Sequence, residues 1–183
     1  MTKDYKWKVL NTKYMHKDPW FTARKDTVQL PTGKVIEEYF VLEYPTWANV
    51  VAVTKDNKFV FVKQYRHGLG VTEYELCAGV CDAGDCTPLT CAQRELLEET
   101  GYGGGDWKEL MTLSPNPATH TNRSYSFLAV GVEKIAEPNL EETEDISTHL
   151  LTLEEVKELI KSNAMSQSLH VAPLLKYLYD NKL

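Results

Sequence analysis

The chain has 183 residues, of which 43% are hydrophobic and 25% are charged, as is ordinary for a folded globular protein. That length is sufficient for one well-buried domain with a small appendage. The formal net charge of -6 argues against broad binding to nucleic acid or to a membrane surface, because both need a basic footprint.

The sequence also predicts a cytoplasmic protein without a membrane partner. No apolar run approaches the roughly 20 residues that a membrane-spanning helix needs. The segment from Met1 to Lys6 is followed by no signal-peptide core.

The N-terminal quarter of the chain is rich in strand-forming residues. Residues 27–30 and 35–42 are separated by the turn sequence Pro31-Thr32-Gly33, which predicts an antiparallel hairpin or small sheet. Pro45 marks a boundary, so we expect an N-terminal β region at residues 1–46 and a main domain at residues 47–183.

Strand and helix signals alternate in the main domain. Residues 48–54 and 59–66 predict a hairpin of buried strands, and a short strand follows at residues 74–77. Thr87 as N-cap, Pro88 after it and Gly101 as a left-handed C-cap delimit a helix. Further strands are expected at residues 107–112, 124–132 and 146–151.

Two C-terminal helices complete the expected fold. The T-x-x-E capping box at Thr152 predicts a helix to about residue 161, and a last helix is expected within residues 168–181. Pro173 must either start this helix or kink it. A sheet with packed helices of this kind is an α+β fold.

The helix between Thr87 and Gly101 carries three carboxylates within one turn. Glu95 lies one turn from both Glu98 and Glu99. Like charges at these spacings destabilise a helix by roughly 0.2–0.5 kcal/mol per pair, whereas a bound divalent cation would use them as oxygen ligands. A solvated acidic face is the alternative.

All four cysteines fall within one stretch of fifteen residues, Cys77 to Cys91. Their spacings lack the C-x2-C pair that is typical of structural zinc sites, so free thiols that pack as small hydrophobic groups are the favoured interpretation.

The acidic helix and its surroundings resemble the Nudix box, G-x5-E-x7-R-E-U-x-E-E-x-G-U, where U is aliphatic or aromatic. The nine residues from Arg94 to Tyr102 match every specified position. With Gly79 as the first glycine, Asp85 stands where the box has its first Glu, with one extra residue before Arg94; counting back from Arg94 gives Cys86 instead.

The resemblance implies a Nudix-type α/β/α sandwich with a mixed sheet, preceded by the small antiparallel sheet. It also implies Mg2+, or Mn2+ in its place, held by Glu95 and Glu99, with Glu98 acting as a ligand or through water. Arg94, Gly79, Gly101 and Asp85 would support this site without contacting substrate.

Two further segments resemble the ADP-ribose pyrophosphatase branch of the family. Residues 62–66, VKQYR, and 73–79, EYELCAG, are similar to its V-x-Q-[FY]-R and E-L-P-A-G motifs, with Cys77 in place of the usual Pro. The resemblance implies that the Ala78 carbonyl completes the metal shell and that Arg66 and Glu75 bind substrate.

The acidic segment at residues 140–146 resembles the loop that carries the catalytic acid in the same branch. Glu142 is the first choice for that role and Glu144 the second, with a plain exposed loop as the alternative. A polar loop at residues 114–123 either contacts substrate or caps the sheet.

Trp20 or Trp47 could stack on a nucleobase, although either is equally compatible with a core position. In this branch the N-terminal strands often exchange between subunits, so a homodimer is expected.

The predicted function is Mg2+-dependent hydrolysis of a nucleoside diphosphate sugar, with ADP-ribose giving AMP and ribose 5-phosphate. A Nudix-fold sensor that binds a nucleotide sugar without turnover is the alternative. Clean-up of nucleoside triphosphates is disfavoured by the two extra motifs.

Overall fold

The computed structural model describes residues 4–183, so the first three residues of the predicted N-terminal region lie outside the description. The chain divides into two compact units. The first comprises the N-terminal segment up to Pro45 together with residues 114–122, and the second comprises residues 46–113 and 123–183.

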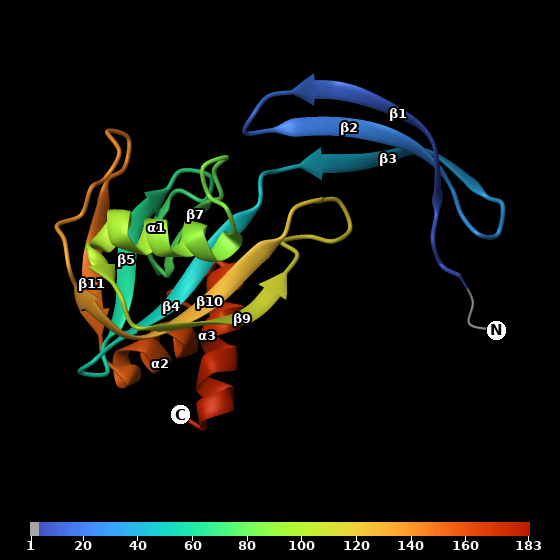
Figure 1. The fold of residues 1–183 in the computed structure, drawn as a ribbon. Helices are drawn as coiled ribbons and strands as arrows, with labels where there is room; N and C mark the ends of the chain where they lie inside the picture. The colour runs from blue at the N-terminus through green and yellow to red at the C-terminus, as the bar shows by residue number, and fades with distance from the viewer. Residues whose placement is uncertain (1–3) are drawn as a thin grey trace. The chain divides into compact units, whose positions relative to one another are not determined.

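The first unit is the small antiparallel sheet that the sequence predicts. Its strands are β1 (Lys8–Lys17), β2 (Thr22–Gln29) and β3 (Val35–Glu43), in the order β1-β2-β3 (Figure 1). Gly33 has a φ of +86° in the β2–β3 turn, a value that glycine adopts without strain. The loop at residues 114–122 belongs to this unit because the Leu42 N–H donates to the Thr119 carbonyl.

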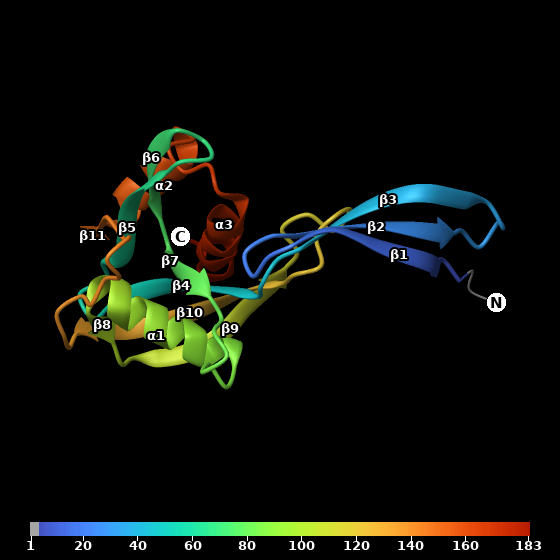
Figure 2. The same cartoon turned by 90° about the horizontal axis from the view of Figure 1, so that it is seen from above.

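The second unit is a mixed sheet between helices. Its strands are β4 (Trp47–Thr54), β5 (Phe59–Arg66), β6 (Val71–Glu75), β7 (Cys77–Val80), β8 (Tyr102–Gly103), β9 (Asp106–Leu113), β10 (Ser124–Lys134) and β11 (Ile146–Leu151). Strands β4 and β10 run parallel, and the other pairs are antiparallel. Figure 2 shows α1 (Pro88–Thr100) on one face of the sheet, with α2 (Leu153–Lys161) and α3 (Ser168–Asn181) on the other.

Alternation along β4 places a hydrophobic core on each side of the sheet. Val51 and Val53 belong to the cluster that includes Leu174 of α3. Val50 belongs to a second cluster with Leu96 of α1. The α+β fold and its α/β/α layers agree with the sequence prediction.

The helix ends follow the sequence signals. Thr87 caps α1 through a capping box with Thr90, and Gly101 ends it at a φ of +75°. Thr152 caps α2 in the same way. Pro173 lies inside α3 and therefore does not start it.

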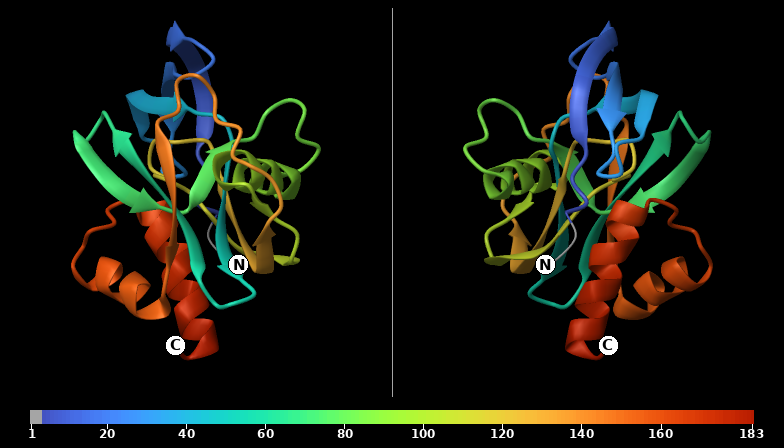
Figure 3. Two further views of the ribbon diagram at one scale, coloured as in Figure 1. Left: turned by 90° about the vertical axis from the view of Figure 1, so that its left-hand side faces the viewer. Right: turned by 90° about the vertical axis from the view of Figure 1, so that its right-hand side faces the viewer.

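One local difference from the prediction concerns residues 71–80. A single short strand was expected, but the chain forms β6 against β5, is interrupted at Leu76, and then forms β7 against β4. The hairpin of β5 and β6 is the green pair of strands in Figure 3. The change of partner at Leu76 is important for the site described below.

Within residues 4–183, no helix is long and apolar enough to cross a membrane.

Candidate active site

The acidic face of α1 is turned toward the protein. Glu95 is 9% exposed and Glu99 is 3% exposed, because their i, i+4 spacing puts both on the side that packs against β7 and the sheet. Glu98 lies on the neighbouring, more exposed side of the helix. The alternative of a solvated acidic face therefore does not hold for Glu95 and Glu99.

Glu95 depends on the absence of a side chain at Gly79. A Cβ atom built on Gly79 would lie 2.1 Å from the carboxyl group of Glu95. The carboxylate also pairs with Arg94 at 2.9 Å. Burial nevertheless raises the pKa of Glu95 to about 7, although Arg94 opposes the rise.

Glu99 is even more confined. Its Oε2 accepts a hydrogen bond of 3.1 Å from the backbone N–H of Ala78. Burial, followed by the charge of Glu95, raises the pKa of Glu99 to about 8. Burial and mutual repulsion thus disfavour the charged forms of two adjacent carboxylates.

Arg94 organises the loop before α1. Its guanidinium donates from Nε to Asp85 Oδ1 at 3.2 Å, from Nη2 to Asp85 Oδ2 at 2.9 Å and from Nη1 to Glu98 Oε2 at 2.9 Å. The hydrogen bonds from Arg94 to Asp85 are the main cause of the lowered pKa of Asp85. Cys86 is exposed, and Asp85 is the one of these two residues that binds Arg94.

Gly101 fixes the other end of the helix. A Cβ on Gly101 would lie 2.1 Å from the carbonyl oxygen of Ala136. The Gly101 carbonyl accepts from the N–H of Ile135 at 2.8 Å. The end of α1 is thereby tied to the segment that follows β10.

The acidic loop brings Glu144 toward the cluster. The charge of Glu144 contributes to the raised pKa of both Glu95 and Glu99. Its Oε2 also accepts from the backbone N–H of Glu141 at 2.8 Å, which fixes the turn. Glu142, the first choice from sequence, is exposed, and the main causes of the raised pKa values of Glu95 and Glu99 do not include it.

Arg66 and Glu75 meet each other. Arg66 Nε donates to Glu75 Oε1 at 2.8 Å, and its Nη2 donates to the other carboxylate oxygen. Glu75 is 2% exposed, whereas the Arg66 side chain is 42% exposed. The hydrogen bond to Glu75 raises the pKa of Arg66, and the charge of Glu99 adds to the rise. Glu75 therefore holds Arg66 in place, and Arg66 is the member of the pair that is open to a ligand.

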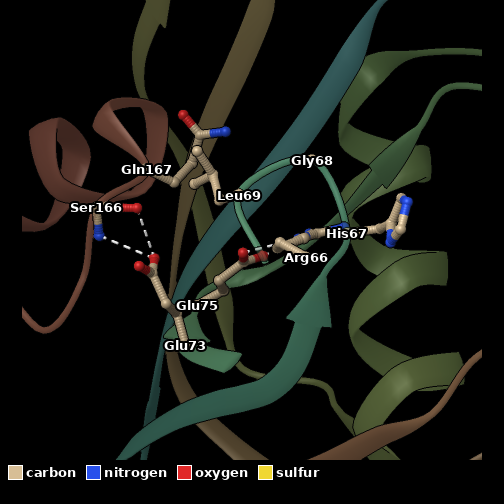
Figure 4. A pocket seen from close by; sticks show the side chains of 8 residues that line it. All are labelled: Arg66, His67, Gly68, Leu69, Glu73, Glu75, Ser166 and Gln167. Carbon is tan, nitrogen blue, oxygen red and sulfur yellow. Dashed lines mark hydrogen bonds and ion pairs between the residues drawn. The ribbon is translucent and has the colours of Figure 1, made fainter. Parts of the chain in front are cut away.

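A pocket of about 330 Å³ opens beside Arg66. Figure 4 shows its lining and the bonds from Ser166 to Glu73. Sequence patterns did not indicate three of the polar residues in this lining: His67, Ser166 and Gln167. They come from the turn after β5 and the loop before α3, which are far apart in the chain, so no local motif could have marked them.

The two candidate tryptophans have different surroundings. Trp47 is half-buried and its ring lies 5.0 Å from that of His170, centroid to centroid. Trp20 is 69% exposed and belongs to the first unit. Trp47 thus has a packing role already, and Trp20 has a free surface.

The residues on α1 suit a hard divalent cation. Within residues 4–183, no three His, Cys, Asp or Glu side chains already converge in a metal-binding arrangement. The chemistry of the donors fits nonetheless, because Glu95 and Glu99 offer buried carboxylate oxygens, and a cation would offset the burial and the carboxylate repulsion that raise their pKa values. The thiols of Cys77 and Cys91 are buried, and the Cys91 thiol donates to the Gly79 carbonyl at 3.9 Å.

Comparison with known proteins supports the resemblance to the Nudix family. Residues 44–171 match the family described as NUDIX domain, and residues 7–42 match the Nucleoside diphosphate sugar hydrolase N-terminal domain. The chain is 31% identical to the ADP-ribose pyrophosphatase of Bacillus subtilis (strain 168) over 161 residues, covering 85% of this chain and 86% of that protein. It is 30% identical to a methanol dehydrogenase activator of Bacillus methanolicus, covering 92% of this chain and 90% of that protein.

The fold has a close counterpart among solved structures. The crystal structure of an ADP compounds hydrolase superposes with a TM-score of 0.79 at 20% identity, over 98% of each chain. Because the NUDIX match spans well over half of the sequence, the chain belongs to the Nudix hydrolase family, in the branch with a nucleoside diphosphate sugar hydrolase N-terminal domain.

Proposed function

We propose that the protein hydrolyses the diphosphate of a nucleoside diphosphate sugar in a Mg2+-dependent reaction, with ADP-ribose as the preferred substrate and AMP and ribose 5-phosphate as products. The observation that carries this proposal is the buried pair Glu95 and Glu99 with the Arg66 guanidinium within electrostatic reach of Glu99. This arrangement combines a site for cations with a fixed positive group for a phosphate.

The α1 carboxylates would hold the metal. Glu95 and Glu99 are the proposed ligands, Glu98 joins directly or through water, and the Ala78 carbonyl stays a predicted ligand. When bound, Mg2+ would neutralise phosphate oxygens and lower the pKa of a coordinated water. Mn2+ has the same preference for oxygen ligands and is the alternative metal.

The remaining chemistry belongs to side chains of this chain. Arg66, held by Glu75, binds a phosphate oxygen of the diphosphate. Water attacks one phosphorus atom, its proton passes to a carboxylate, and the bond from that phosphorus to the bridging oxygen breaks. We assign the proton acceptor to Glu144, because its charge already acts on Glu95 and Glu99, with Glu142 as the alternative on the same loop.

The alternative of a sensor without turnover is less well supported. Its motive was the irregular first half of the Nudix box. Asp85 binds Arg94 through both carboxylate oxygens, so the irregular loop still anchors the helix. The second half of the box, residues 94–102, matches at every specified position.

A substrate panel tests the proposal. ADP-ribose, ADP-glucose, GDP-mannose, dinucleotides and nucleoside triphosphates are incubated with Mg2+, and release of phosphate monoesters is measured. We expect Mg2+-dependent turnover with ADP-ribose as the best substrate, and none with EDTA. No turnover of any diphosphate, with tight calorimetric binding and intact ligand recovered, would establish the sensor instead.

Assembly is a separate proposal. We expect a homodimer, as the resemblance implies, with the exposed Trp20 available for a nucleobase. Light scattering after size-exclusion chromatography measures the mass, and a value near the chain's own 20.9 kDa would contradict the dimer.

A further inference from the structure

His170 is a fully buried histidine on α3, on the face of the sheet opposite α1. It is 0% exposed, and its Nδ1 accepts a hydrogen bond of 2.8 Å from the backbone N–H of Leu76. The two residues are 94 positions apart in the chain. This bond connects the C-terminal helix to the centre of the segment that builds the site.

Leu76 needs a partner of this kind. It lies between β6, which pairs with β5, and β7, which pairs with β4. Where a chain changes its partner strand, the ladder cannot satisfy every backbone group. A buried N–H without a partner would cost about 1–3 kcal/mol, and the imidazole supplies the acceptor.

Both halves of the site begin next to Leu76. On one side, Glu75 holds the Arg66 guanidinium through two hydrogen bonds. On the other side, the Ala78 N–H binds Glu99, and Gly79 makes room for Glu95. The position of one peptide group therefore affects the phosphate-binding cation and the carboxylate pair together.

The neutral imidazole of His170 acts as a hydrogen-bond acceptor through Nδ1. Burial lowers the pKa of His170 to about 3, and the charge of Arg66 lowers it further, so the ring is neutral. With Nδ1 as acceptor, the proton is on Nε2, which has no hydrogen-bond partner within the described residues and lies in a ring that contacts Trp47. A phenylalanine would fill similar space without an unpaired N–H, so the Nδ1 acceptor is what distinguishes histidine from an ordinary core residue.

We propose that His170 is a positioning residue: its bond to the Leu76 N–H fixes the backbone from Glu75 to Gly79, and so sets both Arg66 and the Glu95–Glu99 pair. The consequence for catalysis rests on the proposed function. The consequence for metal binding and for the Leu76 amide does not need turnover.

Two substitutions separate the effect of the Nδ1 hydrogen-bond acceptor from the effect of the ring volume of His170. His170→Phe keeps the ring volume and removes the acceptor, whereas His170→Asn puts an amide oxygen near the place of Nδ1. Leu174→Val is the packing control, since Leu174 is also 0% exposed, lies one turn further along α3 and packs in the same core cluster as Leu76, but its apolar side chain accepts no hydrogen bond. Mn2+ affinity is measured by calorimetry, and kcat and KM are measured where the wild type turns over.

We expect His170→Phe to weaken Mn2+ binding and to lower kcat/KM by about 10-fold to 100-fold, the range for residues that orient metal ligands. His170→Asn should recover most of both losses, and Leu174→Val should lower stability with the Mn2+ affinity unchanged. A folded His170→Phe protein with wild-type Mn2+ affinity would overturn the proposal. Equal losses in the Asn and Phe variants would also overturn it, since the acceptor would then be irrelevant.

Amide hydrogen exchange in the wild type tests the bond without any variant. We expect slow exchange at the Leu76 N–H and an unprotonated Nδ1 in the nitrogen NMR spectrum of His170 at pH 6. Fast exchange at Leu76 would refute the proposal even if His170→Phe does not fold. Absence of turnover in the wild type would remove the proposed function and leave this test intact.

Discussion

Replacement of Glu99 by Gln should stabilise the metal-free protein while it abolishes activity. The pKa of Glu99 rises from its ordinary 4.5 to about 8, chiefly through burial. At about 1.36 kcal/mol per pKa unit, the ionised carboxylate destabilises the folded state by about 5 kcal/mol at high pH. Gln keeps an acceptor for the Ala78 N–H, but its new amide N–H2 needs a partner, so we expect a net gain of about 2–4 kcal/mol at pH 8.

The sign of the pH dependence follows from the same shift. Because the folded-state pKa of Glu99 lies above 4.5, the folded protein binds more protons than the unfolded chain between about pH 4.5 and pH 8. The stability of the metal-free wild type therefore falls as the pH rises through this window. The advantage of Glu99→Gln should be large at pH 8 and almost absent at pH 4.5.

Urea unfolding in EDTA at several pH values measures this effect. Glu98→Gln is the matched control, because Glu98 is on the same helix but is more exposed and pairs with Arg94, so its loss should give no gain. Saturating Mg2+ should reverse the order, since only the wild type keeps both proposed ligands. A Glu99→Gln protein that is less stable than the wild type at pH 8 in EDTA would refute the account of the buried pair.

Three further predictions concern the residues around the pair. Glu144→Gln should lower kcat by about 100-fold or more with little change in melting temperature. Glu142→Gln should lower kcat by less than about 10-fold. The opposite ranking in steady-state kinetics would assign the role of proton acceptor to Glu142. Gly79→Ala should displace the flexible Glu95 side chain that lies 2.1 Å from the added Cβ, so activity should fall by at least about tenfold while the melting temperature changes little, and unchanged kcat/KM would contradict the steric argument. Asp85→Asn should destabilise the protein by about 1–3 kcal/mol at pH 7. Because Arg94 lowers the pKa of Asp85 in the folded protein, this difference should begin to shrink near pH 3.8 and should be lost as the pH falls through the lowered folded-state pKa. A difference in urea unfolding that does not shrink at all below pH 3.8 would exclude the ion pair as its cause.

Local signals in the sequence were sufficient for most of the fold. Thr87, Pro88 and Gly101 act within a few residues of their own position, so the bounds of α1 followed from side-chain chemistry alone. Two apolar runs on either side of a polar turn placed β4 and β5 for the same reason. The break at Leu76 and the two-residue strand β8 were not predicted, because both depend on partners that are distant in sequence.

The site divides along the same line. Glu95 and Glu99 could be selected from sequence, since helical spacing alone puts them on one face. The separate roles of Arg66 and Glu75 could not be predicted from sequence. Which of the two is buried depends on how β5 and β6 pair. The choice of Glu142 or Glu144 as proton acceptor depends on the course of the loop that carries both residues. The sequence does not define that course, because the two glutamates are only two positions apart.

Leu76 shows why a local motif and a distant residue act as one unit here. The box motif supplies Glu95 and Glu99, but their carboxyl groups are confined by Ala78 and Gly79, which belong to a different segment. That segment has no ladder partner at Leu76 and takes one from His170 on the far helix. A site that binds a cation through flexible glutamates needs such confinement, since each freely rotating side chain would lose up to about 2 kcal/mol of rotamer entropy on binding. In the proposed arrangement, α3 acts on the carboxylates of α1 through a single peptide group. Loss of the His170 acceptor should therefore weaken cation binding at Glu95 and Glu99 in a protein that stays folded, whereas loss of apolar volume elsewhere on α3 should lower stability alone.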